Sequence, residues 1–156
     1  MKKIKILFVC LGNICRSPMA EYLMRDKIAK VGLSELIETD SAGTLGENDG
    51  EGMHCGTADV LDRLKIYSND FVSRKVRSED VDIFDYIVTM DHQNLRDIEQ
   101  LFGKREKIFG IASLCPDLAY DHIPDPWYTH RFDETYQLLD ICCDALLEKV
   151  RGEHKI

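Results

Sequence analysis

A cysteine and an arginine separated by five residues are the pair in this chain best suited to chemistry. They are Cys10 and Arg16, and the residues between them are Leu11, Gly12, Asn13, Ile14 and Cys15. Phosphoryl transfer spreads negative charge over three oxygens, which backbone N–H groups at a helix N-terminus and a bidentate guanidinium can bind. The same positive groups favour the thiolate of a cysteine, which is the nucleophilic form. The spacing therefore predicts a phosphate-binding loop, residues 10–17, with Cys10 at its base.

The flanking sequence predicts a strand before this loop and a helix after it. Residues 4–9 are apolar and β-branched, as in a buried strand. Ser17 can act as the N-cap of the helix, and Pro18 suits the first helical position. Gly12 permits a positive φ inside the loop, and Asn13 tolerates one while its side chain ties the loop together. The Ser17 hydroxyl could also donate a hydrogen bond to the cysteine sulfur.

Two simpler interpretations of the N-terminal segment are weaker. A secretory signal is disfavoured because Lys5 interrupts the apolar run, Gly12 and Asn13 end it, and no Ala-x-Ala-like cleavage site follows. A cytoplasmic location is therefore expected, with leaderless export as the alternative. A purely structural Cys10 is disfavoured by the glycine, asparagine, arginine, serine and proline that surround it.

The rest of the chain alternates between strand-like and helix-like segments. The expected strands are 4–9, 37–41, 86–90 and 107–111, and the expected helices are 18–31, 56–64, 92–101 and 132–150. The last helix has one apolar face, formed by Phe132, Tyr136, Leu139, Cys143, Leu146, Leu147 and Val150. Such alternation predicts an α/β fold: a single three-layer domain, residues 1–156, with a central four-stranded parallel sheet and helices on both faces. Residues 45–56 and 112–131 are expected to be surface loops.

Composition narrows the possible functions. The 156 residues carry a net charge of −8, which argues against nucleic acid as a partner. No apolar run approaches the ~20 residues of a membrane span. The six cysteines match neither a disulfide framework nor a zinc pattern, the adjacent Cys142 and Cys143 are expected to be packing residues, and the five histidines are scattered. We expect reduced thiols, no metal and no cofactor.

Four motifs in order resemble the low-molecular-weight protein tyrosine phosphatases along nearly the whole chain. The motifs are residues 9–21, 39–44, 87–95 and 123–128. The resemblance implies hydrolysis of phosphotyrosine and aryl phosphate monoesters through a cysteinyl-phosphate intermediate, without a metal. It implies phosphotyrosine-containing proteins as partners, inorganic phosphate as a product inhibitor, and a monomer. Cys10 would be the nucleophile and Arg16 the anion clamp, with residues 11–17 binding the phosphate.

The resemblance also assigns roles outside the loop. Asp125, held between two prolines, matches the general acid, and an acidic pH optimum is expected because the carboxyl must be protonated to act. Trp127 and Tyr128 would form the walls of a slot for a phenyl ring. Four polar residues would support the loop by hydrogen bonds: Asn13, Ser17, Ser41 and Asp91. Cys15 would trap oxidised Cys10 as a disulfide.

One segment departs from the family pattern. Where many relatives place an aromatic wall, this chain has Leu45 and Gly46 followed by the acidic stretch 47–51, so the wall is either acidic or supplied by Met53 and His54. Substrate sequence preference is therefore open.

Three alternatives to a tyrosine phosphatase remain. Protein-arginine phosphatases tend to have threonine at the position of Ile14 and lack the bulky aromatics. Thiol-dependent arsenate reductases need two shuttle cysteines, and residues 79–110 contain none. A non-catalytic phosphotyrosine-binding module would lack the nucleophile or the acid.

Overall fold

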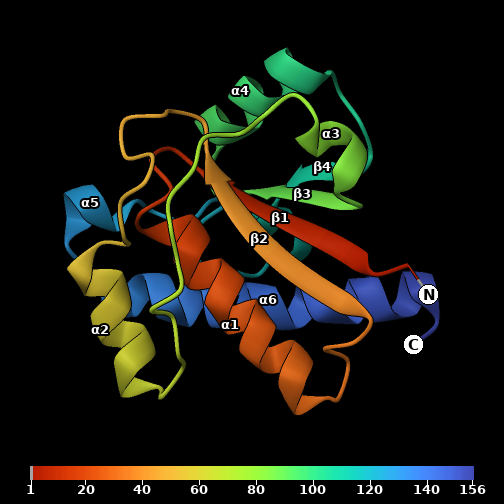
Figure 1. Cartoon of the computed structure of the whole chain (residues 1–156), viewed down its shortest axis with the longest axis horizontal. Helices are drawn as coiled ribbons and strands as arrows, with labels where there is room; N and C mark the ends of the chain where they lie inside the picture. The colour runs from red at the N-terminus through yellow and green to blue at the C-terminus, as the bar shows by residue number, and fades with distance from the viewer. Residues whose placement is uncertain (1) are drawn as a thin grey trace.

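The computed structural model describes residues 2–156, and its centre is a parallel β-sheet (Figure 1). The strands are β1 (Ile4–Cys10), β2 (Ile37–Gly43), β3 (Tyr86–Thr89) and β4 (Ile108–Gly110). They lie in the order β2-β1-β3-β4, and every neighbouring pair is parallel. The predicted four-stranded parallel sheet is therefore confirmed.

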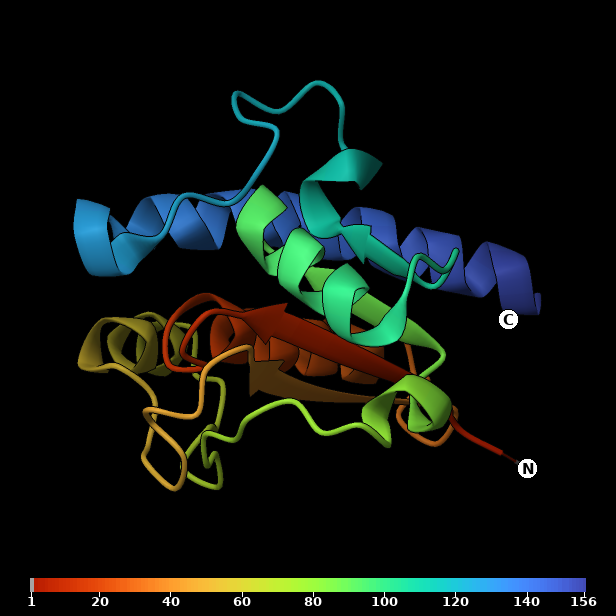
Figure 2. The same cartoon turned by 90° about the horizontal axis from the view of Figure 1, so that it is seen from above.

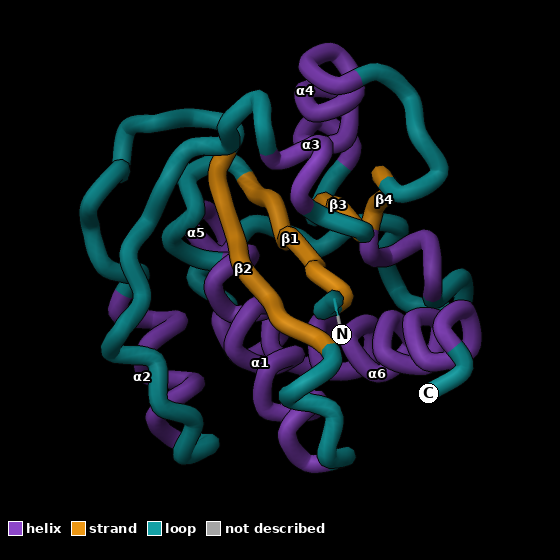
Figure 3. The backbone as a smooth tube through the Cα atoms, turned by 45° about the vertical axis from the view of Figure 1, so that its right-hand side comes forward, coloured by secondary structure: helices purple, strands orange, loops and turns teal. Residues whose placement is uncertain are grey.

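Alternate residues of β1 enter two hydrophobic cores, one on each face of the sheet. Ile6 and Phe8 pack in a core with α1 (Arg16–Lys30), α2 (Cys55–Arg63) and α6 (Phe132–His154). Leu7 and Val9 pack in a second core with α3 (Asp80–Ile83) and α4 (His92–Phe102). Figure 3 shows α1, α2 and α6 on one side of the sheet and α3 and α4 on the other. All four of these β1 side chains are fully buried, which explains the unbroken apolar run of the strand.

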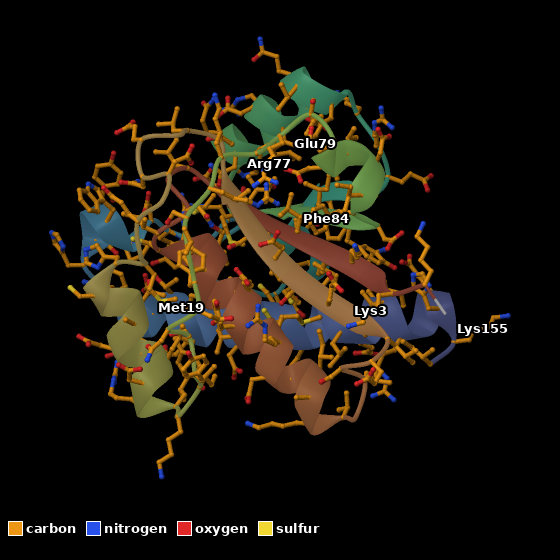
Figure 4. The ribbon with its side chains drawn as sticks, in the orientation of Figure 1. Lys3, Met19, Arg77, Glu79, Phe84 and Lys155 are labelled. Carbon is orange, nitrogen blue, oxygen red and sulfur yellow. The ribbon has the colours of Figure 1, made fainter. Side chains whose placement is uncertain are left out.

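The side chains labelled in Figure 4 include one member of each core. Met19 of α1 is fully buried in the first core, and Phe84, which follows α3, packs in the second. The three expected layers are thus present, with the sheet in the middle.

The last helix is four residues longer than its sequence pattern predicts. Figure 2 shows α6 running along most of the length of the molecule. Leu139, Cys143, Leu146 and Val150 are fully buried as expected, and so is Cys142, which confirms both adjacent cysteines as packing residues. Among residues 2–156, no helix has the length and apolar character needed to cross a bilayer.

The start of α1 differs from the prediction. The helix begins at Arg16 with Cys15 at the N-cap position, so Ser17 is not the cap and no side chain caps this end. Pro18 takes the third helical position, where its missing N–H costs nothing because the first four helical N–H groups have no intrahelical acceptor. The Ser17 hydroxyl is consequently free for another role.

Two short helical segments occupy parts of the loop that was expected at 112–131, and the first of them begins one residue before it. They are the 3-10 turn η1 (Ile111–Leu114) and α5 (Pro126–Thr129). Asp125 caps α5 by accepting a 3.0 Å hydrogen bond from the Trp127 N–H, and Pro126 takes its first position. Local capping chemistry therefore folds a segment that hydrophobic periodicity leaves blank.

Candidate active site

A hollow of about 240 Å³ lies at the carboxyl end of β1, where parallel sheets bind ligands. The phosphate-binding loop forms its base through Cys10, Leu11, Gly12, Ile14, Cys15 and Arg16. Residues of two other segments complete the lining: Leu45, Glu47 and Asn48 after β2, and Asp125, Trp127 and Tyr128 at α5. The structure thus brings together most of the sequence-predicted site residues, while Asn13, Ser17, Ser41 and Asp91 lie around the hollow rather than in its lining.

The carbonyl groups of the loop all bind groups outside it. The carbonyls of residues 10 to 15 accept, in order, from Thr44 N, Leu45 N, Asn48 Nδ2, Ser73 Oγ, His54 N and Thr57 Oγ1. In a trans peptide the C=O and the next N–H point in opposite directions. The N–H groups of residues 11 to 15 donate to no other group among residues 2–156. They therefore form a ring of free donors suited to a tetrahedral oxyanion.

Asn13 fixes the direction of the hydrogen bonds beneath the loop. Its Oδ1 accepts from the Arg74 N–H at 2.9 Å, which orients the amide. Its Nδ2 then donates to Ser17 Oγ at 2.8 Å and to Ser41 Oγ at 2.9 Å, so both amide hydrogens are used.

Each serine hydroxyl therefore accepts from Asn13 and has its own proton left for another partner. Ser17 Oγ lies 3.0 Å from Cys10 Sγ, so its proton points to the sulfur. Ser41 donates to Glu21 Oε1 at 2.6 Å. Ser17 thus offers the Cys10 sulfur a hydrogen-bond donor.

The backbone of the loop turns at Asn13 rather than at Gly12. Asn13 has φ = 57°, whereas Gly12 is not in the left-handed region, so the expectation of a positive φ at Gly12 is wrong. Gly12 has little room for a side chain, since a Cβ there would lie 2.8 Å from Asn48 Nδ2. Gly43, at the end of β2, supports the loop in the same way, since a Cβ would lie 2.8 Å from the carbonyl oxygen of Leu11.

Arg16 is buried and clamped by three acceptors. Its NH1 donates to Asp91 Oδ2 and to the Ile123 carbonyl, both at 2.8 Å, and its NH2 lies 3.3 Å from Asp125 Oδ2. Its Nε has no partner among residues 2–156. Burial opposes the charge of Arg16, but the charges of Cys10, Asp125 and Asp91 outweigh it and raise the pKa of the guanidinium. The clamp therefore remains a cation.

Asp91 connects this clamp to α4. Its Oδ1 accepts from the Asn94 N–H at 2.8 Å as the N-cap of the helix, while Oδ2 binds Arg16. Burial raises the pKa of this carboxyl, but the Asn94 N–H and Arg16 outweigh that effect and hold it below its ordinary value. Asp91 thus stays ionised and orients the guanidinium.

Cys15 lines the hollow beside Cys10 but differs in chemistry. Burial, followed by the charges of Cys10 and Asp125, raises the pKa of the Cys15 thiol to about 12. It is therefore a neutral thiol at ordinary pH.

Two aromatic side chains stand at the edge of the hollow. Trp127 is 53% exposed and Tyr128 is 72% exposed. Behind them, His54 packs edge-on against Trp127 with ring centroids 5.7 Å apart and stacks on Phe132 at 4.8 Å. Met53 and His54 are thus outside the lining, and Leu45, Glu47 and Asn48 form the wall in their place.

Several supporting residues were missed by sequence reasoning. Glu21, Thr57, Ser73 and Arg74 all bind the loop or its network, as given above. Thr57, Ser73 and Arg74 lie outside the four motifs, and Glu21 ends the first motif without a role having been assigned to it. Gly43, at the end of the polar strand β2, was the one residue in the sequence that could have indicated that another segment packs closely against the loop.

Comparison with known proteins agrees with this geometry. The family model described as low molecular weight phosphotyrosine protein phosphatase matches residues 5–156. The chain belongs to this family and is therefore an enzyme of the phosphoric monoester hydrolase class.

Individual relatives extend over almost the full chain. The low molecular weight protein-tyrosine-phosphatase YfkJ of Bacillus subtilis is 40% identical, covering 98% of this chain and 99% of the relative. Its crystal structure matches with a TM-score of 0.94 over 98% of each chain. PtpA of Staphylococcus epidermidis is 36% identical over 94% of each. The structure of a Drosophila arginine phosphatase matches with a TM-score of 0.85 at 27% identity, covering 95% of this chain and 98% of that one.

Proposed function

We propose that this chain, a single domain over residues 1–156, hydrolyses phosphotyrosine in proteins and small aryl phosphates through a cysteinyl-phosphate intermediate without a metal ion. The observation that carries the proposal is the loop after Cys10, whose bound carbonyls leave the N–H groups of residues 11 to 15 without an acceptor beside the hollow that Cys10 and Arg16 line. YfkJ and PtpA, which are named protein-tyrosine-phosphatases, support the choice of substrate.

The first step transfers the phosphoryl group to the enzyme. The Cys10 thiolate attacks phosphorus and forms an S–P bond while the bond from phosphorus to the tyrosine oxygen breaks. Protonated Asp125 gives its proton to that oxygen, so the leaving group departs as a neutral phenol. The loop N–H groups and Arg16 hold the three remaining oxygens, which supplies the positive field that a metal provides in other phosphatases.

The second step releases phosphate. A water molecule attacks phosphorus and gives a proton to the Asp125 carboxylate, and the S–P bond breaks to restore the thiolate. The product is inorganic phosphate, which fits the same ring of donors and should act as a competitive inhibitor. Asp125 must therefore carry its proton at the start of the first step and must have lost it before the second.

Cys15 protects the nucleophile in this proposal. Peroxide converts the Cys10 thiolate to a sulfenic acid, and the Cys15 thiol condenses with it to give a disulfide and water. An added thiol then reduces the disulfide. Peroxide followed by thiol should restore wild-type activity but fail to restore that of Cys15→Ser; equal recovery of both would exclude this role.

A reducing compartment such as the cytoplasm suits an enzyme of this kind, and we propose that it works there as a monomer.

Turnover of p-nitrophenyl phosphate in the presence of EDTA tests the whole proposal. We expect wild-type activity to be unaffected by EDTA and Cys10→Ser to lose more than about 10⁴-fold, since loss of a nucleophile has cost about 10⁶ in a serine protease. Wild-type turnover by Cys10→Ser would exclude the mechanism. Hydrolysis of phosphoarginine in preference to phosphotyrosine would move the chain to the activity for which the Drosophila neighbour is named.

A further inference from the structure

The segment after β2 places a carboxylate at the mouth of the hollow. In Figure 1 this segment is the loop that leaves the tip of β2. Leu45, Glu47 and Asn48 all line the hollow, and Glu47 is exposed. Asp49 and Glu51 follow closely on the same segment.

Hydrogen bonds hold this segment against the phosphate-binding loop. The Leu45 N–H donates to the Leu11 carbonyl at 3.0 Å, and Asn48 Nδ2 donates to the Gly12 carbonyl at 3.3 Å. Further along, the Gly50 N–H donates to the Ser73 carbonyl at 2.9 Å. The Glu47 backbone is thus anchored on both sides, which keeps the residue in the lining of the hollow.

No cation among the described residues forms an ion pair with this carboxylate. Among residues 2–156, Glu47, Asp49 and Glu51 form no ion pair. The aliphatic stem of Lys75 lies beside Gly46, and among residues 2–156 its ammonium forms no ion pair with a carboxylate. An exposed, unpaired carboxylate at a binding site attracts a cation brought by the ligand and repels an anion.

Resting on the proposed function, we infer that Glu47 is a specificity-determining residue that selects phosphotyrosine segments carrying a lysine or arginine next to the phosphotyrosine. The phosphoryl group binds the loop, the phenyl ring lies against Trp127, and a neighbouring basic side chain reaches Glu47. A glutamate or aspartate at the same place in the substrate meets like charge.

Phosphotyrosine peptides that differ in one flanking residue test this inference. Lysine, alanine and glutamate are placed in turn at each of the two positions before and after phosphotyrosine in an alanine-based peptide, and kcat/KM is measured. An exposed ion pair predicts a lysine-over-glutamate preference of about two- to five-fold at one position or more. The preference should shrink as salt rises, because ions screen exposed charges.

Two variants separate Glu47 from the general charge of the segment. Glu47→Gln should bring the lysine-to-glutamate ratio close to one, and Glu47→Lys should invert it. Glu51→Gln removes the same charge four residues away, outside the lining of the hollow, and should keep the wild-type ratio. A wild-type ratio near one, or a ratio lost equally in Glu47→Gln and Glu51→Gln, would overturn the inference.

Failure of the proposed function has a different signature. It would appear as no turnover of p-nitrophenyl phosphate or of any peptide. In that case the same peptides are titrated against Cys10→Ser, with the fluorescence of Trp127, the single tryptophan, as the readout. Tighter binding of lysine peptides that Glu47→Gln abolishes would still support the inference, and equal binding of all peptides would reject it.

Discussion

The phosphate-binding loop and the rim of the hollow, which comprises Leu45, Glu47, Asn48, Trp127 and Tyr128, are built in opposite ways. In the loop, Cys10, Arg16 and Ser17 are at most 3% exposed, and every carbonyl from residue 10 to 15 has a partner. In the rim, Trp127 and Tyr128 keep more than half of their surface in solvent. The groups for chemistry are thus fixed before a ligand arrives, while the two aromatic side chains of the rim are exposed and only Leu45 and Asn48 of the rim are hydrogen-bonded to the loop. Loop variants should alter kcat, and rim variants should alter KM.

Asp125 joins the two regions, and its loss should give the largest effect among the following variants. It lies on the rim segment but faces Arg16 of the loop. Asp125→Asn keeps the shape of the side chain and removes the proton donor, so kcat for phosphotyrosine should fall about 10²- to 10⁴-fold. The fall should be smaller for p-nitrophenyl phosphate, whose leaving group needs less protonation. An unchanged kcat for both substrates would assign the acid to another residue.

Ser17→Ala should give the next largest fall in kcat, and it tests the phosphate-binding loop without altering the rim. The variant removes the donor that points to the Cys10 sulfur, and a hydrogen bond to a charged group is worth about 1.5–3 kcal/mol, or roughly 10- to 100-fold in kcat. Inactivation by iodoacetamide should slow in the variant, because the Cys10 sulfur loses the hydrogen bond from Ser17. Ser113→Ala, at an exposed serine away from the site, is the control.

Trp127→Ala tests the rim alone. Aromatic contacts worth about 0.5–1.5 kcal/mol predict a rise in KM for phosphotyrosine of roughly two- to ten-fold with kcat nearly unchanged. Steady-state kinetics on phosphotyrosine and on phosphoserine peptides measure the effect. A fall in kcat with constant KM would show that the rim and the loop are not separable.

Glu21, beneath the loop, gives a stability effect rather than a rate effect. Burial is the main cause that raises the pKa of Glu21 to about 7 from an ordinary 4.5, against the opposing hydrogen bond from Ser41. The folded state therefore favours the protonated carboxyl. The contribution of Glu21 to the free energy of unfolding is fully present below pH 4.5 and is lost as pH rises through 7.

Glu21→Gln imitates the protonated form at every pH. We expect the variant to gain about 1–3 kcal/mol in unfolding free energy over wild type at pH 8, and nothing at pH 4. Urea unfolding at both pH values measures the difference. Glu35→Gln, at an exposed glutamate, should show no such gain, and an equal gain from both variants would refute the assignment to burial.

The parts of this site that sequence predicts are those whose cause is local. The strand, loop and helix around Cys10 follow from a continuous run of residues with matching propensities, and the sheet follows from strand and helix alternation. The N-cap was placed wrongly because Ser17 is a good cap by type, and only the tertiary structure shows that its hydroxyl serves the sulfur instead. Trp127 and Tyr128 line the hollow, and it was the resemblance rather than periodicity that pointed to them.

The supporting network could not be predicted because its partners are far apart in sequence. Ser73 lies 60 residues from the carbonyl of Asn13 that it binds, and Arg74 lies 61 residues from the Asn13 side chain. Thr57 is 42 residues from the Cys15 carbonyl. Serine, threonine and arginine at these positions are ordinary surface residue types, so nothing in the local pattern separates them from solvent-facing neighbours.

The bound carbonyls of the loop have a consequence for assembly of the chain. Their donors come from residues 44–73, so the eight residues of the loop acquire their shape only when this later stretch has docked. A nascent or partly folded chain would display the motif without the capacity to hold an oxyanion. Anion occupancy is thus coupled to completion of the fold, and vanadate at 100 times its dissociation constant should raise the free energy of unfolding by about 2.7 kcal/mol.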